Sequence, residues 1–122
     1  MWEAASYKKQ TNKIMRSRKE ILKDLISTKG DIQQLEIELS QYPWDSKELI
    51  TLSKKNVIDI LNKVKQKKMS LKDLEAWANT IELRADIKFE TEEVLDIIYK
   101  LANPFLNDPS GGLKNIVEEL LL

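Results

Sequence analysis

Acidic side chains gather in one stretch of the sequence and are the residues best suited to chemistry or binding. Eight carboxylates lie between residues 73 and 99, where Arg84 and Lys88 are the only basic residues, so the net charge there is −6 (2 − 8). Such a group could ligate a cation, or it could dock on a basic partner, since complementary charge speeds association and selects partners. Six of them are the candidate partner-binding residues: Glu82, Asp86, Glu90, Glu92, Glu93 and Asp96.

The spacing of these acids argues against a metal site. They lack the alternating ligands and the loop glycine of a calcium loop. A di-iron bundle needs Glu-x-x-His pairs, and the chain has no histidine. It has no cysteine either, and the Gly111-Gly112 pair lacks the flanking pattern of a phosphate-binding loop. We therefore expect no metal and no cofactor.

The missing histidine and cysteine also bear on catalysis. Histidine is the commonest general base, and carboxylates, lysine or tyrosine would have to act in its place. A chain of 122 residues without either residue type is expected to bind a partner rather than to act as an enzyme, and we identify no catalytic residue.

Basic residues form two further blocks in a chain whose formal net charge is zero. Residues 1–29 carry +5 (8 − 3) and residues 47–72 carry +6 (8 − 2). The run of Lys63, Lys65, Lys67 and Lys68 falls at a predicted helix end, where cations suit the helix dipole, and contains no arginine or aromatic residue for nucleic acid. The N-terminal block is the better candidate for a nucleic-acid surface, through Trp2, Tyr7, Lys8, Lys9, Lys13, Arg16, Arg18 and Lys19.

Helical periodicity runs through nearly the whole chain, and only three glycines and three prolines interrupt it. We expect a first helix over about residues 3–26. Its apolar face consists of Ile14, Ile21, Leu22, Leu25 and Ile26. The Ser27-Thr28-Lys29-Gly30 segment should end that helix, and Asp31 should cap a short second helix that ends near Pro43.

Four further helices follow in the prediction. Ser53, Ser70 and Thr91 are expected to cap helices over about residues 54–65, 71–83 and 92–102, and a short helix follows the Gly111 loop. Their interior stripes are expected to be Val57, Ile58, Leu61 and Val64; Leu71, Leu74, Trp77, Ala78 and Ile81; Val94, Leu95, Ile98, Leu101 and Ala102; and Leu113, Ile116, Val117, Leu120 and Leu121. Trp77 and Ile98 should be buried. Trp44 either covers the end of the bundle or stands exposed as an interface anchor.

No period-two pattern persists, because the alternating segment Ile87-Lys88-Phe89-Glu90 is only four residues long. The predicted fold class is therefore all-α, a compact helical bundle of about five or six helices in a single domain, residues 1–122. No apolar run approaches the roughly 20 residues that span a bilayer, and the N-terminus has no apolar signal-peptide region. We expect a cytoplasmic protein with no membrane partner.

Three segments resemble a known group of proteins. They are WANTIELRADIKFE (residues 77–90), Tyr42-Pro43-Trp44-Asp45 and Leu101-Ala102-Asn103-Pro104. Together they are similar to small helical immunity proteins found beside bacterial toxins, those of contact-dependent growth inhibition and related polymorphic toxin systems, with the colicin immunity proteins as more distant analogues. The resemblance covers residues 42–122, and the basic helix expected within residues 1–30 adds nothing to it.

The resemblance implies a cytoplasmic protein that neutralises one cognate toxin without catalysis. Many such toxins are nucleases, whose basic clefts an acidic inhibitor surface can occupy, and the six candidate acids would form that surface. Two alternatives stay open at this point: a helical adaptor or antitoxin-like regulator, and a nucleic-acid binder that uses the basic N-terminal segment.

Overall fold

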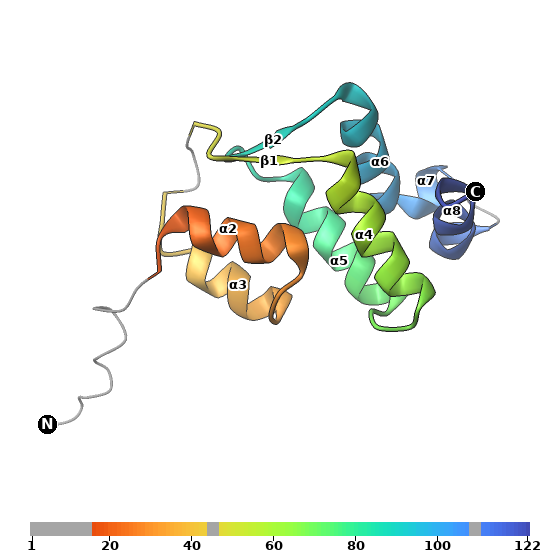
Figure 1. Ribbon diagram of the computed structural model, residues 1–122, viewed down its shortest axis with the longest axis horizontal. Helices are drawn as coiled ribbons and strands as arrows, with labels where there is room; N and C mark the ends of the chain where they lie inside the picture. The colour runs from red at the N-terminus through yellow and green to blue at the C-terminus, as the bar shows by residue number, and fades with distance from the viewer. Residues whose placement is uncertain (1–15, 44–46, 108–110) are drawn as a thin grey trace, which may run out of the picture.

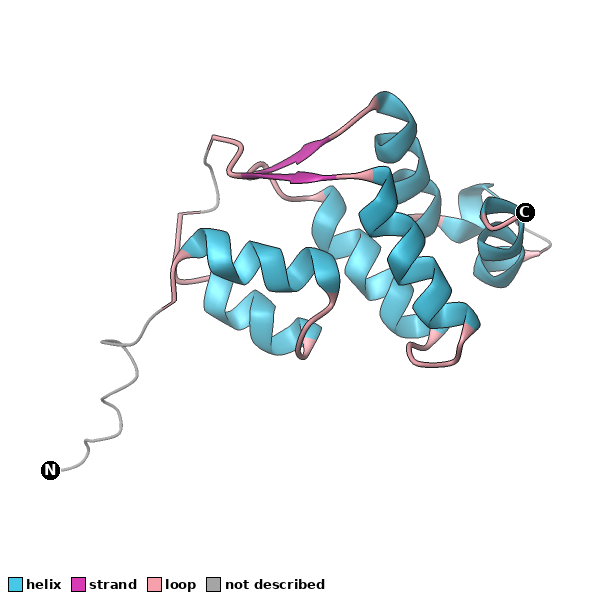
Figure 2. Cartoon of the chain, viewed as in Figure 1, coloured by secondary structure: helices cyan, strands magenta, loops and turns pink. Residues whose placement is uncertain are grey.

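Helices dominate the chain (Figures 1 and 2). This computed structural model describes residues 16–43, 47–107 and 111–122. In chain order the elements are α2 (Arg18–Ser27), α3 (Ile32–Leu39), β1 (Ile50–Leu52), α4 (Lys54–Lys65), α5 (Leu71–Glu82), β2 (Ile87–Phe89), α6 (Glu92–Ala102), α7 (Pro104–Asn107) and α8 (Gly112–Leu120). The predicted all-α helical class is confirmed. The described part holds one helix more than expected, because Pro104 ends α6 and then begins the single turn α7.

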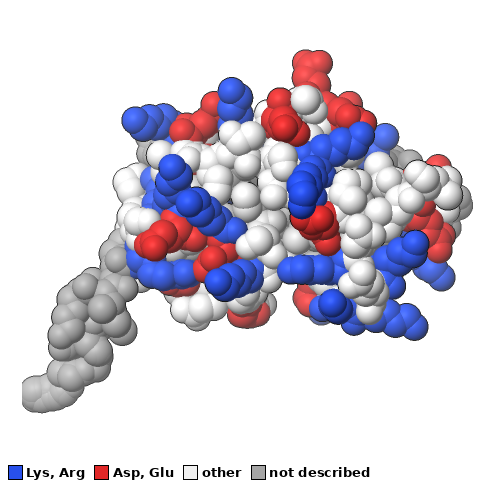
Figure 3. Space-filling view, viewed as in Figure 1, with Lys and Arg blue, Asp and Glu red and all other residues white. Residues whose placement is uncertain are grey.

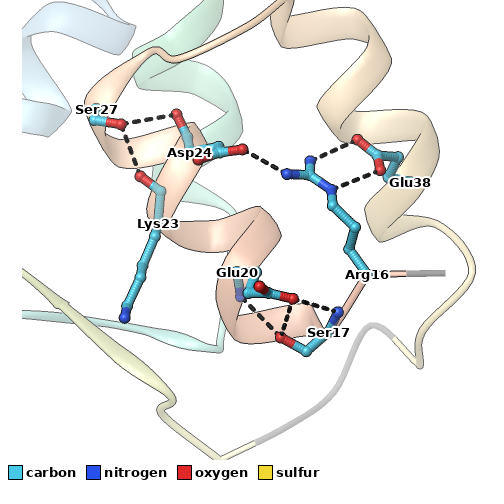
Figure 4. Close-up of polar contacts among 7 residues, drawn as sticks. All are labelled: Arg16, Ser17, Glu20, Lys23, Asp24, Ser27 and Glu38. Atoms are coloured by element: carbon cyan, nitrogen blue, oxygen red, sulfur yellow. Dashed lines mark hydrogen bonds and ion pairs between the residues drawn. The ribbon is translucent and has the colours of Figure 1, made fainter. Parts of the chain in front are cut away.

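Side-chain caps set where the helices begin. Asp31, Ser53, Ser70 and Thr91 each accept a hydrogen bond from the backbone amide three residues later, as predicted. Ser17 does the same for α2 and forms a reciprocal capping box with Glu20 (Figure 4). Each cap contributes about 1 kcal/mol. Ser17 is extended, so the expected continuous helix over residues 3–26 is wrong at residues 16–17, and α2 begins at Arg18. The part of that prediction over residues 3–15 lies outside the described residues, as does Trp44.

The apolar stripes of the helices meet in a single core. Trp77 and Ile98 are both fully buried, which confirms the prediction for each. The Trp77 indole Nε1 donates a hydrogen bond to the carbonyl oxygen of Leu25 at 2.7 Å, so the largest core side chain also ties α5 to α2. None of the described helices has the length and apolar character needed to cross a bilayer.

Two short strands contradict the expectation of no strand. β1 and β2 pair in parallel, with Ile50 opposite Ile87 and Leu52 opposite Phe89. Parallel strands need a long crossover, which α4 and α5 supply here. Leu52 is buried and Ile87 nearly so, and these side chains add to the core between α2 and α6. The segment at 87–89 alternates as a strand does, and its partner lies far away in the sequence.

The strands fix where the acidic stretch lies. Figure 1 shows the α2–α3 hairpin on one side of α5 and α6 with α7 and α8 on the other, while β1 and β2 run along the top edge toward α4 and α6. The stretch from Glu82 to Asp96 therefore leaves the end of α5, passes through β2 and returns along α6. Some of its residues are therefore buried and others are exposed.

Candidate partner-binding surface

The six candidate acids do not form one continuous surface. Glu82 closes α5, Asp86 precedes β2, and Glu90 lies between β2 and α6. Glu92, Glu93 and Asp96 belong to α6, and acidic side chains gather over the N-terminal end of that helix in Figure 3. Each acid has to be considered in its own surroundings.

Asp86 is an interior residue, so its predicted place on the docking surface is wrong. Its side chain is 0% exposed. The Arg84 guanidinium donates Nε to Oδ1 at 2.8 Å and Nη2 to Oδ2 at 2.7 Å, and Arg18 donates Nε to Oδ2 at 2.8 Å. A partner protein cannot reach this carboxylate without breaking the fold.

The pKa of Asp86 reports the same arrangement. Burial acts to raise the pKa of this carboxyl, because it disfavours the charged form. Hydrogen bonds from Arg84 and Arg18 more than offset the burial, and the pKa of Asp86 lies below its ordinary value. The carboxylate is thus a charged structural group held by two arginines, and its task is to join α2 to the start of β2.

Three other acids contact the chain itself. Glu82 is half-buried, and its Oε2 lies 3.4 Å from the Asn103 side-chain nitrogen. Glu90 accepts a hydrogen bond from the backbone amide of Lys54 at 3.0 Å, and Glu93 forms an ion pair with the Lys54 ammonium at 3.1 Å. These contacts hold the start of α6 against the start of α4. Since Glu93 and Lys54 are both exposed, their ion pair contributes about 0–1 kcal/mol.

Glu92 and Asp96 are the acids left for a partner. Both are exposed on α6 one turn apart, and neither has a side-chain partner among the described residues. Leu95 and Tyr99 lie beside them and are 42% and 45% exposed. Positions separated by three, four and seven residues share one side of a helix. We call Glu92, Leu95, Asp96 and Tyr99 the α6 outer face.

The exposure of Leu95 shows that the predicted interior stripe of α6 is wrong at this residue. The observed stripe contains Ile97, which is 6% exposed, in the place expected for Leu95. Residues 95 and 97 lie on opposite sides of the row formed by Val94, Ile98 and Leu101. The spacing of apolar residues is therefore compatible with burial of either one. The packing of α6 on α5 selects Ile97 and leaves Leu95 in solvent. An apolar residue counted as core is therefore part of the surface.

The basic N-terminal set is partly used inside the fold. Arg16 donates Nε and Nη2 to Glu38 at 3.1 and 2.8 Å and Nη1 to Asp24 at 2.6 Å (Figure 4). The hydrogen bonds that the Arg16 guanidinium donates to the Glu38 and Asp24 carboxylates raise the pKa of Arg16 above its ordinary value. Arg18 in turn forms an ion pair with Asp86. Two of the basic residues proposed to bind nucleic acid therefore pair with carboxylates of the chain itself. Trp2, Tyr7, Lys8, Lys9 and Lys13 lie outside the described residues.

No group of three or more carboxylates in residues 16–43, 47–107 and 111–122 is placed to hold a metal ion.

No known protein family, curated protein or solved structure matches the chain. The choice of function therefore depends on the surfaces described above and on the sequence resemblance.

Proposed function

We propose that this chain is an immunity protein that binds and neutralises a cognate secreted toxin, a nuclease with a basic cleft, in the cytoplasm. It would act by binding alone and would have no catalytic activity. The observation that carries the proposal is the α6 outer face, where Glu92 and Asp96 have no side-chain partner in the part of the chain that the structure describes and lie beside the exposed Leu95 and Tyr99.

The chemistry of this face suits a protein interface better than a solvated surface. Tyrosine is enriched at interfaces, where its ring supplies contact area and its hydroxyl a hydrogen bond. Glu92 and Asp96 would pair with the lysines and arginines that a nuclease uses to hold phosphates. The two carboxylates would then lie where the phosphates of the nucleic acid otherwise bind. Leu95 and Tyr99 would supply the apolar contact that ion pairs alone lack.

The scaffold also supports this role, because α6 is held in two places. Val94, Ile98 and Leu101 fix its inner face in the core. The Glu90 and Glu93 contacts to Lys54 fix its first turn. A binding face that does not need to order on association loses less conformational entropy, which raises affinity.

The direct test is co-purification with the product of the adjacent gene, followed by a nuclease assay on the isolated toxin with and without this chain. We expect a stable complex and loss of nuclease activity at equimolar ratio. A complex that forms while the toxin keeps full activity would indicate an adaptor instead. Binding of an RNA or DNA duplex that weakens steeply with salt would favour the nucleic-acid alternative.

A further inference from the structure

A groove lies at the C-terminal end of α4. Lys54, which contacts α6, is at the opposite, N-terminal end of the helix. The last turn of α4, the α4–α5 loop, the start of α5 and one side of α8 enclose a volume of about 730 Å³. The loop turns sharply at Lys67, whose φ of 63° is in the left-handed region. Three segments far apart in the sequence thus form one concave surface.

The floor of this groove is apolar and incompletely covered. Val117 is buried, whereas the other four floor residues are only partly buried and pack at the margin of the core. Those four are Val64, Met69, Leu71 and Leu121. They come from α4, the α4–α5 loop, the start of α5 and the residue after α8, and an apolar side chain from outside could cover them.

The rim of the groove is basic. Lys65, Lys67, Lys68 and Lys114 line it, are exposed, and have no side-chain partner within the described residues. Lys63 differs from them, because its ammonium donates to the Ser27 carbonyl and the Thr28 hydroxyl at the end of α2. Basic side chains gather around the α4–α5 loop and the facing side of α8 in Figure 3. Two acids, Asp73 and Glu118, also line the groove.

We infer that this groove, with four rim lysines around an apolar floor, binds an acidic amphipathic helix of a partner protein. An incoming helix with leucines on one face would cover Val64, Met69 and Leu121, and glutamates flanking that face would meet the rim lysines. This is the helix-in-groove mode of recognition, with charge complementarity selecting the partner.

The lining favours a protein segment over a nucleic acid. Single-stranded nucleic acids are held by aromatic side chains on which bases stack, and by arginine. The described residues that line this groove include neither type. Asp73 and Glu118 would repel a polyphosphate chain, whereas an amphipathic helix can place a neutral or basic residue opposite each of them.

This inference goes beyond the proposed function and does not depend on it. The groove is basic and lies at the C-terminal end of α4, whereas the α6 outer face is acidic and adjoins the N-terminal end of α4. The two surfaces therefore call for partners of opposite charge. Either one can be abolished while the other is kept.

The test uses the full chain and a designed peptide of about 18 residues, long enough to form a helix in the groove. Leucines repeat at i, i+3, i+4 and i+7, glutamates flank them, and neutral glutamine and alanine fill the remaining positions; a twin peptide has lysines in place of the glutamates. We expect the glutamate peptide to bind roughly tenfold more tightly than its twin, and the double variant Lys67→Glu with Lys68→Glu to lose about the same factor. Glu92→Lys with Asp96→Lys should bind the peptide as the parent does.

Met69 supplies a direct reporter of the site, because it is one of only three methionines in the chain. Its methyl resonance, assigned through Met69→Leu, should shift when the glutamate peptide is added. Equal affinity for the two peptides, an unmoved Met69 methyl, or undiminished binding by the lysine double variant would overturn the inference. So would a single-stranded oligonucleotide or an anionic phospholipid vesicle that shifts the Met69 methyl where the glutamate peptide does not.

Discussion

Arg18 and Asp86 are 68 residues apart in the sequence, and in the fold the Arg18 Nε lies 2.8 Å from the Asp86 carboxylate. The same guanidinium donates to the carbonyl oxygen of Pro43 and lies over the Tyr42 ring, 5.7 Å from its centroid. One arginine thus joins the first turn of α2 to the end of the α2–α3 hairpin and to the segment before β2. Asp86, one of the six acids predicted for the binding surface, instead helps to hold these parts of the fold together.

Asp86→Asn should destabilise the fold strongly. The substitution keeps the size of the side chain but leaves Arg18 and Arg84 without a charged partner in a largely buried place. Breaking a buried ion pair costs about 3–5 kcal/mol, and we expect about 3 kcal/mol because both guanidinium groups keep some contact with water. Urea unfolding at pH 7 measures the change. Glu92→Gln, which neutralises an exposed acid in the first turn of α6, is the control and should cost no more than about 0.3–1 kcal/mol through the helix dipole.

Acidification should reduce the effect of the same substitution. The pKa of Asp86 is lower in the folded protein than the value of about 3.9 in an unfolded chain, so the unfolded state binds more protons as the pH falls through that region. The stability that the charged carboxylate supplies is therefore fully present above about pH 4 and is lost as the pH falls toward its folded pKa. The difference in unfolding free energy between parent and Asp86→Asn should be smaller at pH 3 than at pH 7. A difference that is the same at both values would contradict this account of the cluster.

Trp77→Ala should cost about 3–5 kcal/mol, because the indole is fully buried and its removal leaves a cavity in the core. Trp77→Phe separates packing from hydrogen bonding. It keeps an aromatic ring in the core but removes the 2.7 Å hydrogen bond to the Leu25 carbonyl oxygen. Because the Thr28 amide still donates to that oxygen at 3.2 Å, losing the indole hydrogen bond should cost about 0.5–1.5 kcal/mol. Thermal and urea unfolding of both variants provide the test. A melting temperature unchanged by Trp77→Ala would show that the core is assigned wrongly.

The helices were predictable from the sequence because their signals are local. A cap such as Ser53 or Thr91 acts within three residues, and the burial of Trp77 and Ile98 follows from spacing along one helix. Ser17 could have been recognised in the same way, since Glu20 stands three residues later in the capping-box pattern. Local chemistry was sufficient wherever the deciding partner lay within one or two helical turns.

The strands and the site required information from distant parts of the chain. Ile50 and Ile87 become strand residues because they pair with each other across two helices, and neither segment is long enough to show a pattern alone. Asp86 shares its residue type and neighbourhood with the exposed acids, and only the approach of Arg18 distinguishes it. The Arg84-x-Asp86 spacing was the available hint, since such a pair can close over a short turn. Leu95 was misplaced because the direction in which α6 faces is set by its packing on α5.

Leu95 and Tyr99 should be dispensable for folding and needed for toxin binding. Since both are exposed, Leu95→Ala with Tyr99→Ala should change stability by about 1 kcal/mol or less, whereas Ile98→Ala on the inner face of the same helix should cost about 2–5 kcal/mol. Affinity for the cognate toxin, measured by calorimetry, should fall at least roughly tenfold in the Leu95 and Tyr99 double variant, because truncating interface aromatic anchors commonly costs 2 kcal/mol or more. Retained affinity would remove α6 from the interface.

Charge reversal on the α6 outer face tests the electrostatic part of the proposal. Glu92→Lys with Asp96→Lys should weaken toxin binding and slow association, and the loss should shrink as salt rises, because exposed charges are screened. The variant should still fold, since losing an acid at the first turn of α6 costs about 0.3–1 kcal/mol through the helix dipole. Binding curves at two ionic strengths, with circular dichroism as the check on folding, provide the measurement.

Two control variants make that reversal specific. Glu48→Lys with Glu119→Lys changes the net charge by the same +4 at two exposed acids that are not part of the α6 outer face, and should bind the toxin nearly as well as the parent. Lys67→Glu with Lys68→Glu should leave toxin affinity unchanged, because those lysines border the groove at the far end of α4. If the Glu48 and Glu119 variant loses as much affinity as the α6 variant, the toxin responds to overall charge. If the lysine variant is the damaging one, the toxin binds at the groove, and the acidic face of α6 has another role.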